Sequence, residues 1–205
     1  MTTLSASDLV VRPGQGEKTA SDMVMVFRNG RLGGHFSIME GEVRPGELLA
    51  FHTHANEDQH MYIIEGELHF EVGGADGIRF TAGAGEHVLK PRGTSHGFWN
   101  LGEATARYVE TSTEGGFERF VDGRQGGLNS MLEQARGELG MTFEVQRAME
   151  VMKEFGLTGL AGANLPEPHK LLTDPGFHKM MASSPVAREF FLQLGGNKLK
   201  AALGL

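Results

Sequence analysis

The sequence predicts a mainly β protein with a helical C-terminal part, and two observations carry this prediction. First, 21 of the 30 glycines precede Leu128, which indicates many tight turns in that part of the chain. Second, between Met23 and Thr111, short runs of β-branched and aromatic residues alternate with turn signals about every 8–12 residues. This spacing is typical of an antiparallel β-sandwich or β-barrel.

Turn residues divide the segment 23–115 into about seven to nine expected strands. The first strand, Met23–Arg28, ends at an Asn29-Gly30 turn. Further breaks are expected at Pro45-Gly46, Gly73-Gly74, Gly83-Ala84-Gly85 and Pro91-Arg92-Gly93. Residues 1–22 are largely polar and are expected to form an N-terminal arm.

The segment 116–205 is expected to form a C-terminal helical extension, because its apolar residues take up helical spacing. One apolar stripe consists of Leu128, Met131, Leu132, Ala135 and Leu139. A second helix is expected to begin at Thr142 as N-cap and to stop at Gly156. Asp174-Pro175 and Ser184-Pro185 predict two more short helices, because proline favours the first helical position.

Composition excludes several classes of function. The 26 acidic and 19 basic residues give a formal charge of −7, which argues against a nucleic-acid partner. Without cysteine the chain cannot form disulfides, thiolate zinc sites, iron–sulfur clusters or a cysteine nucleophile. The N-terminal segment lacks the apolar stretch of a signal peptide, and no apolar run is long enough to span a membrane, so a cytoplasmic protein with no membrane partner is expected.

The histidines are the informative part of the composition, because six of the nine lie between His52 and His96. His52 and His54 are two residues apart, so on a strand they point to the same side and can share one metal ion. Glu57 and Gln59 share that side if the strand restarts after a short turn at Ala55-Asn56. His96 follows a tight turn and is a further candidate ligand.

These residues resemble the two motifs of a cupin. The first motif is matched by Gly46, His52, His54, Gln59 in place of the usual Glu, and Gly66. The second motif is matched by Gly85, Pro91, Gly93, His96 and Asn100. The resemblance covers roughly residues 24–110 and implies a small antiparallel β-barrel of the jelly-roll type. It also implies one divalent transition metal inside the barrel, held by His52, His54, Gln59 and His96.

The glutamine at position 59 is the one departure from the cupin motifs. An amide oxygen is a neutral, weaker ligand than a carboxylate, and it is not a base. Two alternatives therefore stay open: a three-histidine site with no fourth protein ligand, or a site in which Glu57 or Asp58 is the ligand. Imidazole with an oxygen ligand suits Fe, Mn, Ni, Co, Cu or Zn, and the sequence does not choose among them.

Alternation along the ligand strands predicts which residues line the cavity. Met61, Ile63 and Phe98 share the face of the ligands, although the same residues would equally serve as barrel core. Because these residues are apolar, a flat or aromatic small-molecule substrate is expected rather than a sugar or a dicarboxylate. No Arg or Lys lies on the ligand strands, which argues against an anion.

A second resemblance concerns the activity. The stretches 57–67, 115–120 and 155–157 are similar to single-domain bacterial cupins of the quercetin dioxygenase-like type. This resemblance implies that dioxygen oxidises a small aromatic or enolic, metal-chelating metabolite such as a flavonol. In that family the carboxylate ligand also acts as the base, which would place the catalytic role at Gln59. Because an amide is no base, either Glu57 takes this role, or the substrate arrives already ionised, or the reaction is of another kind. The alternatives are a non-oxidative cyclase, isomerase or decarboxylase, and a metal-dependent binding protein without turnover. Cupins of this size commonly pair, so a homodimer is expected.

Overall fold

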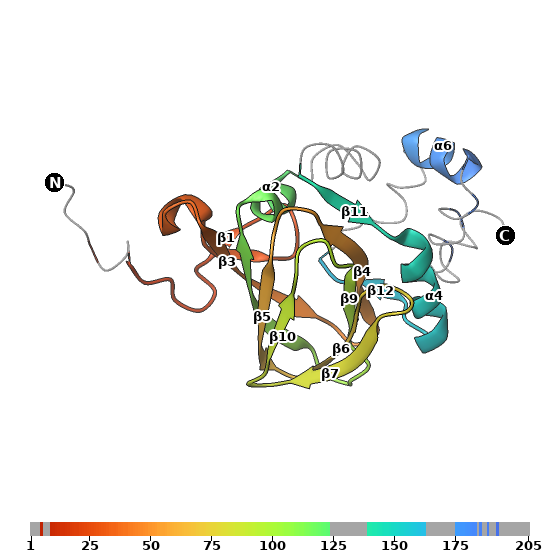
Figure 1. The fold of residues 1–205 in the computed structure, drawn as a ribbon, viewed down its shortest axis with the longest axis horizontal. Helices are drawn as coiled ribbons and strands as arrows, with labels where there is room; N and C mark the ends of the chain where they lie inside the picture. Colours follow the sequence, from red (N-terminus) through yellow and green to blue (C-terminus); the bar gives the residue numbers. More distant parts are fainter. Residues whose placement is uncertain are drawn as a thin grey trace.

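Two antiparallel sheets face each other in a computed structural model that describes residues 9–123, 139–162 and 175–183, together with Ser5, Pro185, Arg188 and Leu192 (Figure 1). The first sheet runs β1 (Glu17–Lys18), β2 (Val24–Phe27), β3 (Phe36–Val43), β10 (Ala106–Thr113), β5 (Gln59–Glu65) and β8 (His87–Lys90). The second sheet runs β11 (Met141–Phe143), β4 (Glu47–His54), β9 (His96–Trp99), β6 (Glu67–Val72) and β7 (Ile78–Gly83), and β12 (Gly159–Leu160) pairs with β4 in parallel.

The predicted fold class is confirmed. The segment 23–115 contains nine strands, β2 to β10, and from β4 onward the chain passes repeatedly between the two sheets. The expected turn at Asn29-Gly30 is a short 3-10 helix, η1 (Asn29–Leu32). This wound, double-sheet arrangement is a jelly roll, in which positions far apart in the chain meet between the sheets.

The main core lies between the sheets and follows the alternation of the strands. On β10, for example, every second side chain from Ala106 to Ser112 is buried. The core includes the large apolar side chains of Met39, Met61, Ile63, Phe70, Phe98 and Tyr108. Burial of each such side chain contributes about 1.5–3 kcal/mol, so this layer holds the two sheets together.

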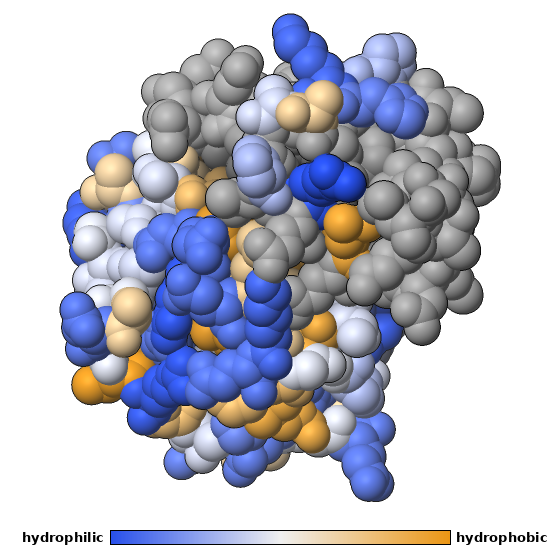
Figure 2. All heavy atoms as spheres, turned by 90° about the vertical axis from the view of Figure 1, so that its right-hand side faces the viewer, coloured by the Kyte–Doolittle hydropathy of each residue, from blue (hydrophilic) through white to orange (hydrophobic). Residues whose placement is uncertain are grey.

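A second core joins helix α4 (Val145–Phe155) to the outer face of β4 and β9. It contains Leu48, Phe51, Trp99, Ala148, Met149, Val151, Met152 and Leu157. The helix ends where the sequence predicts, at Gly156, whose φ of 67° is the left-handed conformation of a C-terminal cap. Hydrophilic side chains dominate the described part of the face shown in Figure 2.

The predicted start of this helix at Thr142 is wrong. Thr142 lies in β11, which pairs with β4 over residues 141–143, and the helix begins only after Glu144. The physical reason is that β4 would otherwise leave an edge without backbone partners, and residues 141–143 supply them. Because β11 and β12 both pair with β4, the C-terminal segment completes the second sheet as well as covering it.

The remaining helices bear on the expectations in different ways. Helix α2 (Gly116–Asp122) follows β10 directly, and α6 (Pro175–Ser183) begins at the predicted proline. The expected helix over 128–139 and the one from Ser184-Pro185 lie almost wholly outside the described residues. The division into segments 1–22, 23–115 and 116–205 stays a prediction. Among the described residues, no helix combines the length and the apolar character needed to cross a membrane.

Candidate metal centre

A β-bulge on β4 determines which side chains of this strand face the main core and which face the second core. Leu49 pairs with Phe98 and His52 pairs with His96, so β4 has one residue more than β9 between these two pairs. Leu49 and His52 therefore both face the interior, whereas Phe51 packs against α4 on the opposite face. Bulges of this kind often re-aim side chains beside functional sites.

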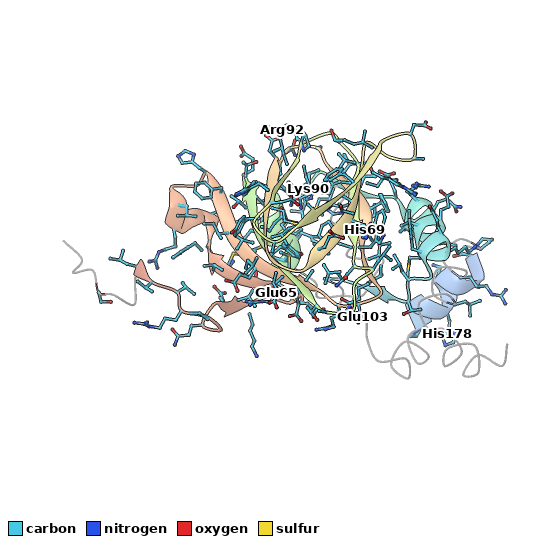
Figure 3. All side chains as sticks on the ribbon, turned by 90° about the horizontal axis from the view of Figure 1, so that it is seen from below. Glu65, His69, Lys90, Arg92, Glu103 and His178 are labelled. Atoms are coloured by element: carbon cyan, nitrogen blue, oxygen red, sulfur yellow. The ribbon has the colours of Figure 1, made fainter. Side chains whose placement is uncertain are left out.

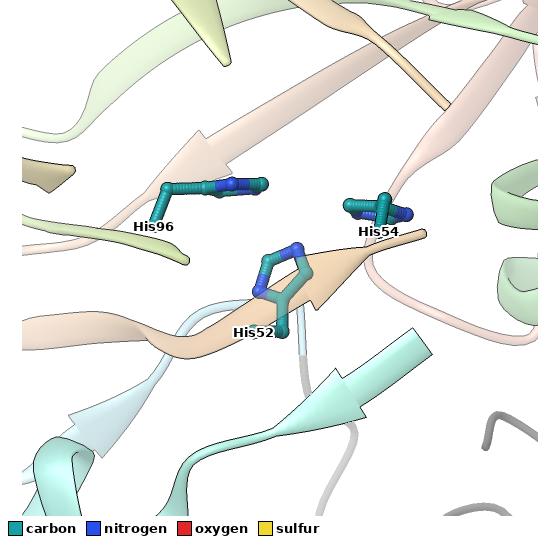
Figure 4. Close-up of side chains that lie close together, drawn as sticks. All are labelled: His52, His54 and His96. Atoms are coloured by element: carbon teal, nitrogen blue, oxygen red, sulfur yellow. The ribbon is translucent and has the colours of Figure 1, made fainter. Parts of the chain in front are cut away.

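His52, His54 and His96 converge between the sheets (Figure 4). One nitrogen of each ring lies within 4.8 Å of the corresponding nitrogens of the other two, and all three side chains are buried. The ring centroids of His52 and His96 are 4.4 Å apart, and those of His52 and His54 are 4.8 Å apart. The structure thus brings together the three histidines that the sequence predicts as ligands.

Each of these rings is fixed through its Nδ1 atom, which faces an oxygen atom. His52 faces the carbonyl oxygen of Ala50 at 2.7 Å, and His96 faces that of Thr94 at 3.1 Å. His54 faces the carboxylate of Glu57 at 3.0 Å. When Nδ1–H donates in this way, the lone pair of the neutral ring is on Nε2. Within the described part of the chain, the buried Nε2 atoms of His54 and His96 have no hydrogen-bond partner. This arrangement, with Nδ1 anchored and Nε2 free, is that of metal-binding histidines.

Burial keeps these imidazoles neutral. It lowers the pKa of His52 and of His96 well below the ordinary 6.5, and the neighbouring histidine of each lowers it further. Burial also lowers the pKa of His54, although the hydrogen bond with Glu57 partly opposes this effect. Only a neutral imidazole can bind a metal ion, so the cluster favours the ligating form.

Gln59, at the start of β5, has the properties expected of a fourth ligand. Its side chain is buried, and neither amide atom has a hydrogen-bond partner among the residues described. A buried amide without partners is costly, and a metal ion at Oε1 would satisfy its oxygen. The donor set therefore fits a divalent transition metal held by three imidazoles and one amide oxygen, and the ligand role of Gln59 stays a prediction.

The structure places Glu57 behind His54 rather than among the ligand atoms. One carboxylate oxygen faces Nδ1 of His54, and the other accepts hydrogen bonds from the backbone N–H groups of Phe117 (2.8 Å) and Gly115 (3.2 Å). A Cβ atom at Gly116 would lie 3.2 Å from this carboxylate, so glycine permits the close approach of α2. Glu57 thereby links the start of α2 to a metal-binding ring.

Asp58, the other alternative ligand, faces the surface. Its carboxylate accepts hydrogen bonds from the backbone N–H of Arg92 (2.9 Å) and from the Arg92 guanidinium (2.7 Å). Both side chains of this pair are exposed. The carboxylate of Asp58 is thus fully engaged outside the barrel interior.

The sequence analysis missed two charged residues inside the barrel, Lys90 on β8 and Glu110 on β10. Their side chains are only 2% and 3% exposed, and Lys90 Nζ lies 2.7 Å from Glu110 Oε2. Burial lowers the pKa of Lys90 and raises that of Glu110, and each residue opposes the shift of the other. The expectation that no cation faces the cavity considered only the ligand strands β4, β5 and β9. Alternation along β8, which buries Val88 and Lys90, is the sequence signal that could have placed Lys90 inside the barrel.

The expected pocket residues Met61, Ile63 and Phe98 are buried in the main core. Their contact with a substrate stays a prediction. A pocket of about 460 Å³ lies beside the centre and is lined by Asn56, Glu57, Arg92, Glu114, Gly115, Gly116, Arg119 and Leu139. Glu57 lines this pocket and also forms the hydrogen bond with His54, so the pocket lies next to the histidine cluster.

Comparison with known proteins finds a family model that covers the histidine cluster. Residues 39–112 match the family model described as "Cupin domain", and this stretch contains the three histidines and Gln59. A curated relative, "Polyketide synthase CurC" from Streptomyces cyaneus, is 33% identical over 67 residues, which are 33% of this chain and 42% of the relative. The match therefore spans less than half of the length of that relative.

Solved structures with similarity to the chain include two bacterial proteins. One is an uncharacterized conserved protein with a double-stranded β-helix domain from Klebsiella pneumoniae, with 23% identity, a TM-score of 0.41, and coverage of 56% of this chain and 92% of that one. The other is a predicted oxalate decarboxylase from Thermotoga maritima, with 22% identity, a TM-score of 0.40, and coverage of 45% and 78%.

Proposed function

We propose that residues 39–112, which match the family model described as "Cupin domain", form a cupin domain, and that the protein is a metal-dependent enzyme that oxygenates a small phenolic or enolic metabolite. One observation carries the proposal: three buried imidazoles, each anchored at Nδ1, lie so close together that one nitrogen of each ring is within 4.8 Å of those of the other two. Dioxygen is the proposed co-substrate, as the resemblance to quercetin dioxygenase-like cupins implies.

The proposed metal ligands are His52, His54, His96 and Gln59. A divalent metal bound there would act as a Lewis acid toward an oxygen atom of the substrate. Glu57 holds the ring of His54 and increases its basicity by accepting the Nδ1 proton in a hydrogen bond. Gln59 adds no charge, so the metal would keep more of its positive charge for the substrate than it would with a carboxylate ligand.

The surroundings of the centre favour a flat, chelating substrate. Phe98 and Met61 provide apolar walls on opposite sheets, and such walls exclude water from the reacting atoms. The name of the curated relative, a polyketide synthase, supports the same class, because polyketides are rich in phenol and β-dicarbonyl oxygens that chelate metals.

Elemental analysis of protein purified without chelators, followed by oxygen-uptake measurements with flavonols and other chelating phenols, tests this proposal. We expect about one metal ion per chain and oxygen consumption that requires the metal. His52→Ala and His96→Ala should each lose the metal, because each removes one of three imidazoles. Full metal content in either variant would refute the ligand assignment. No oxygen uptake with Fe, Mn, Ni, Co or Cu would refute the oxygenase.

A second candidate is a non-oxidative enzyme such as a cyclase, isomerase or decarboxylase. Two observations favour it: Gln59 cannot act as a base, whereas the buried Glu110 carboxylate can accept a proton without any oxidant. Product formation under strict anaerobiosis would identify this candidate. Binding of metal and ligand with no turnover in either atmosphere would instead indicate a binding protein.

A further inference from the structure

One row of polar side chains crosses the inner face of the first sheet without internal hydrogen bonds. Ser37, Ser112, Gln59 and Lys90 are successive neighbours in the registers of β3, β10, β5 and β8. In the part of the chain that the structure describes, the buried hydroxyls of Ser37 and Ser112 and the amide of Gln59 have no partner. Folded proteins rarely bury several unpaired polar groups together, so this row points to a bound polar molecule.

Glu110 lies in the next row, between Met39 and Met61. Its Oε2 atom accepts a hydrogen bond from Lys90 Nζ at 2.7 Å, whereas its Oε1 atom is buried and unpaired among the described residues. An ion pair that only stabilised the fold would be expected to satisfy both oxygens. The carboxylate instead keeps one acceptor atom free inside the barrel.

This ion pair faces the metal centre across the interior. Lys90 Nζ lies 5.3 Å from the centre of the Phe98 ring, and Phe98 follows His96 by two residues on the inner face of β9. The positive charge of Lys90 contributes to the lowered pKa of His52, of His54 and of His96. Figure 3 shows Lys90 within the barrel and Arg92, two residues later, at its rim. The second sheet therefore presents the imidazoles, and the first sheet presents Glu110.

We propose that Glu110 is a substrate-binding residue whose free Oε1 accepts a hydrogen bond from a hydroxyl group of the substrate, and that Lys90 positions this carboxylate. This inference rests on the proposed function and narrows its substrate class to neutral chelators that carry a hydroxyl group, such as polyphenols. A dicarboxylate is disfavoured, because it would bring a second negative charge against Oε1 with no proton between the two oxygens.

The test measures binding of quercetin, in the absence of oxygen, to the cobalt-loaded protein. This coloured flavonol can chelate a metal through its 3-hydroxyl and 4-carbonyl oxygens and still carries hydroxyl groups that can donate a hydrogen bond. Two variants are compared with wild type: Glu110→Gln, and the double variant Lys90→Met with Glu110→Leu. The double variant replaces both charges with apolar groups of similar size, so no unpaired charge is left in the core. The control is Glu40→Gln on the outer face of β3, where the side chain is exposed next to Arg107.

We expect all four proteins to bind about one cobalt ion and to give the same circular dichroism spectrum. The dissociation constant for quercetin should rise at least tenfold in both Glu110 variants and stay unchanged in Glu40→Gln. Oxalate should bind wild type more weakly than quercetin does.

Three results would overturn the inference, and they separate it from the proposed function. If the folded, cobalt-loaded double variant binds quercetin as wild type does, the ion pair is only structural. If wild type binds cobalt but not quercetin, or prefers oxalate, the substrate class is wrong while the metal centre stands. If wild type binds no cobalt, the proposed function fails, and this inference fails with it.

Discussion

The oxygen atom behind each imidazole sets how strongly that imidazole can bind a metal. His52 and His96 face neutral backbone carbonyls, whereas His54 faces the carboxylate of Glu57. A negative acceptor raises the basicity of the ring more than a neutral one does. At the scale of single residues, Glu57 and the proposed ligand Gln59 are the two positions expected to set the metal affinity of the centre.

Glu57→Gln should lower the affinity for zinc or cobalt about 10- to 100-fold, because the amide removes the negative charge behind His54. Competition with a chromophoric chelator measures the affinity. Asp58→Asn is the matched control: it neutralises the adjacent carboxylate, which pairs with Arg92 outside the barrel, and should leave the affinity unchanged. Equal affinities in wild type and Glu57→Gln would contradict the role assigned to Glu57.

Gln59→Glu should have the opposite effect and raise the metal affinity, because it adds a negative charge at the proposed fourth ligand. The same competition measurement gives the affinity, and the visible spectrum of the cobalt protein reports the change of ligand. If affinity and spectrum both stay as in wild type, Gln59 is not a ligand.

At the scale of elements, one buried carboxylate attaches α4 to the second sheet. Glu71 on β6 accepts hydrogen bonds from Arg79 on β7 (2.8 Å) and from Arg147 on α4 (2.6 Å). Arg79 also contacts Glu154 and lies over the rings of Trp99 and Phe155. This network and the apolar second core together hold the helix on β4 and β9.

Glu71→Gln should destabilise the protein by about 2–3 kcal/mol, because it removes a buried negative charge that the largely buried Arg147 and the exposed Arg79 share. Urea denaturation measures this loss of unfolding free energy. Glu150→Gln changes an exposed partner of the same Arg147 and should leave the unfolding free energy almost unchanged. Similar losses in the two variants would show that burial of Glu71 is not what matters.

The same network predicts a dependence on pH. Burial raises the pKa of Glu71, but the hydrogen bonds from Arg147 and Arg79 outweigh burial and keep the pKa below its ordinary value of 4.5. The unfolded chain therefore binds a proton at Glu71 more readily than the folded protein does, and the stabilisation is lost as pH falls below about 4.5. Thermal unfolding from pH 6 to pH 3 should show a steeper loss in wild type than in Glu71→Gln. Parallel curves would contradict this assignment.

At the scale of the whole molecule, metal binding should stabilise the fold, because the proposed ligands come from β4, β5 and β9 in both sheets. Metal at 100 times its dissociation constant should add about 2.7 kcal/mol to the unfolding free energy. Thermal unfolding with and without a chelator measures this gain. The variant His52→Ala should show none, and an equal gain in that variant would place the metal elsewhere.

The homodimer and the cytoplasmic location stay predictions. Light scattering can test the homodimer.

Much of the fold and of the candidate site follows from local sequence signals. Glycine and proline turns predict the strands of the segment 23–115, and the two-residue spacing of His52 and His54 predicts a shared face. The start of α4 could not be predicted in this way, because Thr142 pairs with β4, a strand almost 90 residues earlier. Nor could the destination of Phe51, because the bulge that directs it outward exists only relative to β9.

By itself, the sequence determined an antiparallel sandwich or barrel and the shared face of His52 and His54, because alternation along strands and turn chemistry act over a few residues. The resemblance to the cupin motifs implied the jelly-roll type and added His96 to the candidate metal ligands. Only the tertiary structure decided what surrounds those histidines. Glu57 turned out to support His54 and to hold the start of α2, and Lys90 was paired with Glu110 between the sheets. These partners belong to separate strands and loops, so their contacts depend on strand register and sheet packing, which no local pattern encodes.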